Sequence, residues 1–145
     1  MNISISLIDW EQGRSSLLRI RHEVFVEEQG VPVELEHDAQ DRDARHLLAS
    51  IDGQPVATAR MLANGHIGRM AVLREWRRRG IGTAMLRRLI GLARADGLVE
   101  VVLNAQVVAE PFYQGLGFDA RGGLFEDAGI AHRQMVLNIQ TAADR

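Results

Sequence analysis

Four arginines and two glycines stand together in the middle of the chain, between an apolar run and a periodic segment. They are Arg74, Arg77, Arg78 and Arg79, followed by Gly80 and Gly82. Glycine has no Cβ, so an anion can approach the backbone N–H groups of such a loop, and a following helix adds the positive end of its dipole. Arginine adds charge and a forked pair of donors. The loop is therefore predicted to bind a phosphate or pyrophosphate.

The two commonest phosphate-binding motifs do not occur at this loop. The dinucleotide fingerprint needs glycine where the chain has Met85, and the P-loop needs lysine, of which the sequence has none. The pattern present is R-x-x-G-x-G, formed by Arg77, Gly80 and Gly82. A strand–helix turn flanked by solvated arginines is the alternative interpretation.

A second group of charged residues precedes the loop and is acidic. Its carboxylates belong to Glu27, Glu28, Glu34, Glu36, Asp38, Asp41 and Asp43, and only Arg42 opposes them locally. We expect an irregular or short helical segment around Pro32. It is either a solvated loop or a wall whose field attracts a cationic amine substrate.

The length and composition limit the classes of protein to consider. The chain has 145 residues, a net charge of −2 and no cysteine, so one domain over residues 1–145 is expected, without disulfides or thiol catalysis. The first residues lack the basic and apolar regions of a signal peptide, and no apolar run reaches the length of a membrane span. A soluble cytoplasmic protein with no membrane partner is the expectation.

Apolar periodicity and turn residues predict an alternating α/β order. Asp52-Gly53 and Asn64-Gly65 indicate hairpins. The nearly continuous apolar run at 99–103, interrupted by Glu100, indicates a central strand that lies parallel to the strand at 67–73. Arg21 shares a helix face with apolar residues, where it could snorkel at the edge of the core. The expected strands are 3–7, 46–51, 56–62, 67–73, 99–103, 120–124 and 130–137, and the helices are 12–28, a long one after Gly82, and a short one from Pro111 to Gly117.

Two motifs in this order resemble the GNAT acetyltransferase superfamily across nearly the whole chain. The first is Met70-Ala71-Val72 with the R-x-x-G-x-G loop, and the second is Phe112-Tyr113-x-x-x-Gly117-Phe118. The stretches 21–29 and 36–38 are similar to the ElaA-type branch. The resemblance implies a mixed central sheet of about seven strands flanked by helices. It also implies a splay between the strands at 66–73 and 99–105.

The same resemblance implies acetyl-CoA as co-substrate and no metal. Its pyrophosphate would lie on the amides of residues 78–83, and its pantetheine would pair with the backbone of residues 70–72. The implied cofactor residues are Met70, Ala71, Val72, Arg77, Arg78, Arg79, Gly80, Ile81, Gly82, Thr83, Asn104 and Gln106. The implied acceptor residues are Arg21, Phe25, Glu28, Glu36 and Asp38.

The chemistry implied is direct transfer of the acetyl group to a primary amine in a ternary complex. Tyr113, the chain's single tyrosine, stands at the family's position for the general acid. A phenol with an ordinary pKa of about 10 stays protonated at neutral pH and can donate to a departing thiolate. The alternative is a tyrosine that packs beside Phe112 and Phe118.

The general base is not assigned by the sequence. Some relatives carry a glutamate where this chain has Val101, and Glu100 faces the other side because neighbouring strand residues alternate. Other relatives carry an asparagine where Gln106 stands. The open candidates are Glu28, His37, His46, His66 and a water relay.

An N-acetyltransferase acting on a small amine or a peptide amine is thus the leading hypothesis. One alternative is a catalytically weak GNAT-fold protein that binds CoA as a regulatory ligand. The other is a module that binds phosphate or nucleic acid through residues 74–79, which the slightly acidic remainder of the chain argues against. We expect no nucleic-acid partner, and a homodimer stays open.

Overall fold

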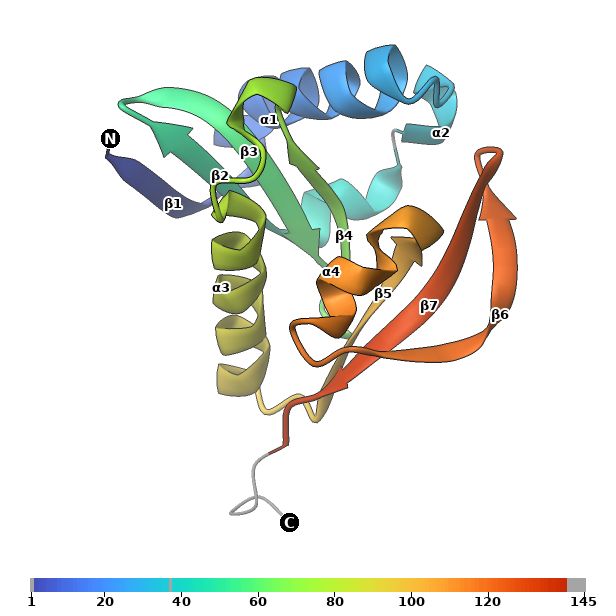
Figure 1. Ribbon diagram of the computed structural model, residues 1–145. Helices are drawn as coiled ribbons and strands as arrows, with labels where there is room; N and C mark the ends of the chain where they lie inside the picture. The colour runs from blue at the N-terminus through green and yellow to red at the C-terminus, as the bar shows by residue number, and fades with distance from the viewer. Residues whose placement is uncertain (1, 37, 141–145) are drawn as a thin grey trace.

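A computed structural model describes residues 2–36 and 38–140 as one seven-stranded mixed sheet with helices on both faces (Figure 1). The order of the strands across the sheet is β1-β2-β3-β4-β5-β7-β6. The strands are β1 (Ile3–Ile8), β2 (Arg45–Ile51), β3 (Gln54–Met61), β4 (His66–Val72), β5 (Glu100–Gln106), β6 (Asp119–Asp127) and β7 (Ile130–Asn138). This confirms the predicted fold class.

The helical segments cover the two faces and supply the connections. The α-helices are α1 (Trp10–Arg21), α2 (Val33–Glu36), α3 (Ile81–Ala95) and α4 (Glu110–Gln114). A π-helix, η1 (His22–Glu28), continues α1, and the 3₁₀ segments are η2 (Ala39–Asp43), η3 (Arg74–Trp76) and η4 (Val107–Ala109). The single helix predicted over 12–28 is therefore α1 followed by the wider turns of η1.

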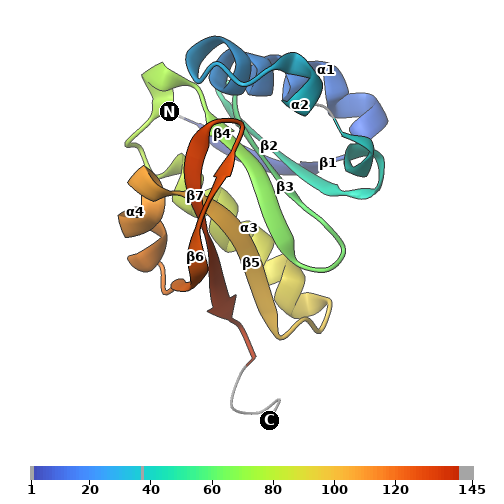
Figure 2. The same cartoon turned by 90° about the vertical axis from the view of Figure 1, so that its right-hand side faces the viewer.

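The faces of the sheet carry separate apolar contacts. Leu86 and Leu89 of α3 pack in the main core cluster with Val101 of β5. Ile20 of α1 packs with Ala71 of β4 in a second cluster. Alternation along the strands therefore places α3 on one face and α1 on the other, as Figure 2 shows from the side.

The predicted hairpin turns form at both Gly-containing dipeptides. Asp52 and Gly53 have φ values of +50° and +84°, which suits the mirror-image turn that joins two twisted strands. Gly65 has φ +89° in the turn between β3 and β4. The hairpin of β6 and β7 is longer than predicted, since the strands pair as far as Asp127 and Ile130. The short helix is α4, whose regular part ends at Gln114. Gly117, with φ +98°, ends the turns that follow, where its N–H donates to the Gln114 carbonyl and the Phe118 N–H donates to the Tyr113 carbonyl, as predicted.

The parallel strands β4 and β5 separate after a short contact. Their pairing is limited to His66 with Val102 and Ile67 with Leu103. On its other edge β5 pairs with β7 along its whole length, from Glu100 to Gln106. The β3–β4 ladder shifts register next to Arg69, whose φ is +49°. Figure 1 shows the two strands diverging. The predicted splay is confirmed.

Candidate active site

A cavity of about 310 Å³ lies at the splay, on the face of the sheet opposite α3. The π-helix η1 and α2 form one wall, β4 and β5 form the floor, and α4 and the tip of the β6–β7 hairpin complete it. Six of the predicted site residues line it: Phe25, Glu36, Met70, Asn104, Gln106 and Tyr113. The fold thus brings residues from distant parts of the chain to one place.

Tyr113 lies on α4 between two other aromatic rings. Its ring meets Phe112 edge-on at 5.0 Å and Phe118 at 5.9 Å between centroids. Burial raises the pKa of Tyr113 to about 12, so the phenol is protonated at neutral pH. Tyr113 therefore packs beside Phe112 and Phe118, as the alternative interpretation predicts. It also lines the cavity, where a general acid would have to lie. Its role as proton donor stays a prediction.

The glycine loop presents backbone donors at the start of α3. The first helical bond runs from the Ala84 N–H to the Gly80 carbonyl at 3.0 Å, so the amides of residues 81–83 have no acceptor within the helix. No described side chain caps this end, and Gly80 has φ +81°. A Cβ at position 82 would meet only Phe112, at 3.9 Å. The loop therefore offers amides to an anion beside α4.

The arginines of the loop are partly engaged with other residues. Arg77 donates both Nη groups to Glu28 at 2.6 and 2.7 Å, and its Nε donates to the Val72 carbonyl at 2.8 Å. Arg74 lies 3.5 Å from the same carboxylate, and Arg79 lies over the Trp76 ring at 4.9 Å. Glu28 thus neutralises part of the cluster, which weighs against the nucleic-acid alternative, while Arg74, Arg78 and Arg79 are exposed.

The contacts of Arg77 affect two predictions: that pantetheine pairs with the backbone of residues 70–72, and that Glu28 is a candidate base. Arg77 occupies the Val72 carbonyl, so this acceptor on β4 is already bonded. The hydrogen bonds from Arg77 lower the pKa of Glu28 despite partial desolvation. A carboxylate whose two oxygens accept from one guanidinium is a weak base, which argues against Glu28 as the general base.

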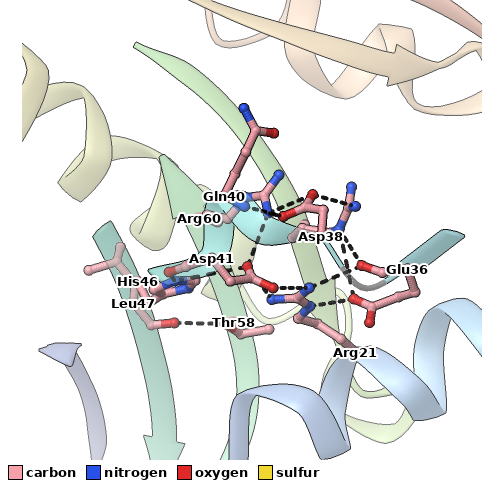
Figure 3. Close-up of polar contacts among 10 residues, drawn as sticks. Arg21, Glu36, Asp38, Gln40, Asp41, His46, Leu47, Thr58 and Arg60 are labelled. Atoms are coloured by element: carbon pink, nitrogen blue, oxygen red, sulfur yellow. Dashed lines mark hydrogen bonds and ion pairs between the residues drawn. The ribbon is translucent and has the colours of Figure 1, made fainter. Parts of the chain in front are cut away.

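The acidic segment folds into an ion-pair network that includes buried arginines (Figure 3). Arg21 is 1% exposed and donates to the Glu36 carboxylate, and its two Nη groups reach Asp41 at 2.9 and 3.0 Å. Arg60, which lies on β3, joins the same network: its Nη1 donates to Asp41 at 3.0 Å and to Asp38 at 2.8 Å. The expected edge position of Arg21 is wrong, since this guanidinium is internal.

Arg69 adds a third cation to this network. Its Nη2 donates to Asp38 at 3.0 Å, and its Nε donates to the Glu36 carbonyl at 3.2 Å. The carboxylates of Glu36, Asp38 and Asp41 thus face three arginines. The segment is neither a solvated loop nor a wall of unopposed negative charge, and both interpretations are corrected. Substrate contacts of Arg21, Glu36 and Asp38 stay a prediction.

The network shifts the pKa values of its members. Burial by itself would raise the pKa of Asp41, but the hydrogen bonds and charges of Arg21 and Arg60 outweigh it and lower that pKa. Burial would lower the pKa of Arg21, and Asp41 and Glu36 reverse the shift and raise it. Each ion is stabilised in its charged form by its partners.

The histidine candidates for the base differ in position. His46 is 1% exposed, with Nε2 2.7 Å from the Asp41 carbonyl and its ring stacked on Trp10. It does not line the cavity, which argues against it as the base. His37 lies outside the described residues. His66 lines the cavity, and burial, aided by the charge of Arg60, lowers its pKa.

Three cavity residues were missed by the sequence interpretation: Arg60, Arg69 and His132. His132 pairs across the sheet with Gln106, and its Nδ1 lies 2.7 Å from the Ile130 carbonyl. A carbonyl can only accept, so Nδ1 carries the proton and the neutral ring keeps a lone pair on Nε2. Strand alternation could have paired His132 with Gln106 only if the register had been known.

Two further predictions concern metal and membranes. In residues 2–36 and 38–140, no group of three or more His, Cys, Asp or Glu side chains is arranged to hold a metal ion. Among the helices of the same residues, none is both long and apolar enough to span a membrane.

Comparison with known proteins places this arrangement in a family. Residues 11–139 match the model of the acetyltransferase (GNAT) domain. The uncharacterised N-acetyltransferase YjcF of Bacillus subtilis is 36% identical over 121 residues, covering 81% of this chain and 86% of YjcF. Protein ElaA of Escherichia coli is 30% identical over 132 residues, covering 86% of each chain.

Solved structures agree with the sequence relatives. An acyl-CoA N-acyltransferase from Pseudomonas aeruginosa superposes with a TM-score of 0.81 at 30% identity, covering 94% of this chain and 98% of its own. The Escherichia coli ElaA structure gives a TM-score of 0.82 at 26% identity, covering 95% and 100%. A splayed β4–β5 pair, a glycine loop opening α3 and the family-model match along most of the chain lead to one conclusion: this protein belongs to the GNAT acetyltransferase family.

Proposed function

We propose that the protein transfers an acetyl group from acetyl-CoA to a primary amine by direct attack in a ternary complex. The observation that carries this proposal is the cavity at the splay, which is lined by both Met70 and Tyr113. The glycine loop lies beside α4, since a Cβ at Gly82 would be 3.9 Å from Phe112. An acyl thioester entering through the splay would thus present its carbonyl to the cavity.

In the proposed reaction the amine nitrogen attacks the thioester carbon, and a tetrahedral intermediate forms. Collapse of the intermediate breaks the C–S bond, and Tyr113 donates its proton to the departing sulfur. The amine nitrogen loses a proton to a base, and bulk solvent restores Tyr113. Backbone N–H groups of β4 at the splay would stabilise the oxyanion, as preorganised donors do.

His132 is the base that the geometry supports best. Its Nδ1 proton is held by the Ile130 carbonyl, so Nε2 is the nitrogen that can accept a proton in the cavity. Exchanging His132 for glutamine should lower kcat/KM by about 10²-fold or more, as loss of a general base does. His22→Gln, at an exposed histidine outside the cavity, is the matched control. A wild-type kcat/KM for His132→Gln together with a loss of activity in His66→Gln would assign the base to His66.

The proposed activity is tested by thiol release from acetyl-CoA in the presence of a panel of primary amines and peptides. We expect amine-dependent release together with the acetylated amine, seen by mass spectrometry. Binding of acetyl-CoA without turnover of any amine would favour a regulatory CoA-binding protein instead. Failure to bind acetyl-CoA by calorimetry would reject both.

A further inference from the structure

Two arginines give the cavity at the splay a cationic lining that the proposed acetyl transfer does not use. Arg60 comes from β3 and Arg69 from β4, and both line the cavity together with His66 and Tyr113. An amine acceptor that was only a cation would gain nothing from two guanidinium groups. Asp38 and Asp41 pair with only part of these guanidinium groups, so the donors left over call for a further acceptor.

Arg60 is buried, with part of its guanidinium unpaired. Its side chain is 7% exposed, and its bonds to Asp38 and Asp41 all leave from Nη1. The Nε atom is buried without a partner among the described residues. Unsatisfied buried donors are rare because each costs about 1–3 kcal/mol. Nε and Nη2 point in the same direction, so together they can donate two parallel hydrogen bonds to the two oxygens of one carboxylate.

Arg69 owes its position to the irregularity in β4. Its φ of +49° is unusual for a non-glycine residue and lies where the β3–β4 ladder shifts register. The side chain anchors through Nε to the Glu36 carbonyl and through Nη2 to Asp38. Nη1 has no hydrogen-bond partner within the described residues and lies on a side chain that lines the cavity. The strained backbone is thus accompanied by a fixed, partly unpaired cation.

The carboxylates near the cavity balance the charge of these arginines but leave some of their donors unpaired. Asp38 and Asp41 accept from Nη1 of Arg60, and Asp38 accepts from Nη2 of Arg69. Glu36 is 3% exposed, and its carboxylate accepts from Arg21. The other titratable groups that line the cavity are Asp127 at the exposed hairpin tip, His66, His132 and Tyr113. No carboxylate that lines the cavity accepts a hydrogen bond from the remaining donors of Arg60 and Arg69 within the described residues.

We propose that the acceptor is an amine that carries a carboxylate, and that Arg60 and Arg69 bind this carboxylate. The inference rests on the proposed acetyl transfer and narrows its substrate class to amino acids or similar small zwitterions. A cavity of about 310 Å³ accommodates molecules of this size. The arginines hold the acid group, and the amine faces the thioester at the splay.

The test compares each α-amino acid with its own α-amide as acceptor for the wild-type protein, using thiol release from acetyl-CoA. The two molecules differ in charge and hardly in size. The amide has the less basic amine, so an enzyme indifferent to the carboxylate would favour the amide. We expect the best amino acid to exceed its amide in kcat/KM by about 10- to 100-fold, as a charge-assisted hydrogen bond provides.

The variant Arg69→Gln should lower kcat/KM for the amino acid about tenfold or more, with little change for the amide. The ratio of the two kcat/KM values should therefore fall toward one. Arg69→Lys, which keeps the charge but not the fork, should restore part of the preference. Arg42→Gln is the matched control, since Arg42 is an exposed arginine of the same acidic segment that does not line the cavity. A merely structural role of Arg69 would lower both rates and leave the ratio unchanged.

The outcomes separate this inference from the proposed function. Turnover of amides as fast as acids in wild type would overturn the inference and leave acetyl transfer intact. Preference for O-phosphoethanolamine over ethanolamine, without a preference for amino acids over amides, would replace the carboxylate by a phosphate and also overturn it. No turnover with any amine would reject the proposed function itself.

Discussion

Tyr113 shows how one side chain can satisfy packing and chemistry together. Its ring contacts Phe112 and Phe118, and the same burial that these contacts provide raises its pKa to about 12. The raised pKa keeps the phenol protonated at any pH where the protein is expected to work. It also makes the phenol a weaker acid than an exposed tyrosine, which limits its contribution to catalysis.

Exchanging Tyr113 for phenylalanine removes only the hydroxyl. We expect kcat to fall on the order of 10²-fold at most, since general acid catalysis contributes about 10²–10⁴-fold and a thiolate is already a good leaving group. Acetyl-CoA affinity, measured by calorimetry, should change little. A wild-type kcat for Tyr113→Phe with a good acceptor would show that solvent protonates the thiolate.

At the scale of elements, the start of α3 and the π-helix η1 meet at the ion pair of Arg77 with Glu28. A second link joins η1 to β5, where Gln106 Nε2 donates to Gln29 at 3.0 Å. Gln29 directly follows η1, and Val24 of η1 packs with Ala71 of β4, so the π-helix and its C-terminal cap contact both strands that form the splay. π-Helical turns are common at functional sites because they re-aim side chains, and here η1 brings Phe25 into the cavity.

The loop prediction is tested at Gly82, where a Cβ has room. Acetyl-CoA should raise the melting temperature of the wild-type protein, because it binds only the folded state. Gly82→Asp should abolish this rise by placing a carboxylate against the pyrophosphate, and the variant should still fold.

The control for this experiment is Gly91→Asp, at an exposed position of the same helix where a Cβ meets nothing within 4 Å. It adds the same charge without facing the loop and should keep the full thermal shift. Equal shifts in the wild type and Gly82→Asp would show that the pyrophosphate binds elsewhere.

At the scale of the whole molecule, the ion network joins α1, the acidic segment and the central strands. Arg21 bonds across 15 residues to Glu36 and across 20 residues to Asp41, and Arg69 reaches back across 31 residues to Asp38. Buried charges are costly alone and tolerable in complete sets. Loss of one member should therefore cost more than loss of an exposed pair.

The variant Asp41→Asn should lower the free energy of unfolding by about 3–5 kcal/mol, because it leaves Arg21 and Arg60 buried with less negative charge. Chemical denaturation measures this change. The matched control is Asp43→Asn, an exposed carboxylate two residues along the chain, which should stay within about 0.5 kcal/mol of wild type. Equal stability of the two variants would contradict the structural role of the network.

The network also determines how stability depends on pH. The folded-state pKa of His46 is lowered, mainly by burial, so its contribution is complete above its unfolded pKa of about 6.5 and is lost as the pH falls through the folded value. The pKa of Asp41 is lowered too, so its contribution begins to be lost below about pH 3.9. The lowered pKa values of His66 and Glu28 add to the first and the second stage respectively. Unfolding free energies measured against pH should fall in these two stages, and Asp41→Asn should show a smaller fall in the second.

Local patterns in the sequence determined most of the turns and helices of this protein. The two hairpin turns, the glycine loop and the long helix after it depend on residues a few positions apart, so propensity and periodicity suffice to predict them. The position of Tyr113 on a short helix, and the family motifs around it, were readable for the same reason. The splay followed from the family resemblance and not from any local signal.

Tertiary structure alone decided which charges meet. The sequence showed Arg21 next to apolar residues and a run of carboxylates, but their pairing depends on how α1 and η2 pack against β3. Arg60, Arg69 and His132 enter the cavity through strand register and through a bulge at Arg69, which no short-range pattern encodes. The physical reason is that side chains far apart in sequence become neighbours only when the sheet assembles. The interactions of each charged group then depend on the partners that the assembled sheet places beside it.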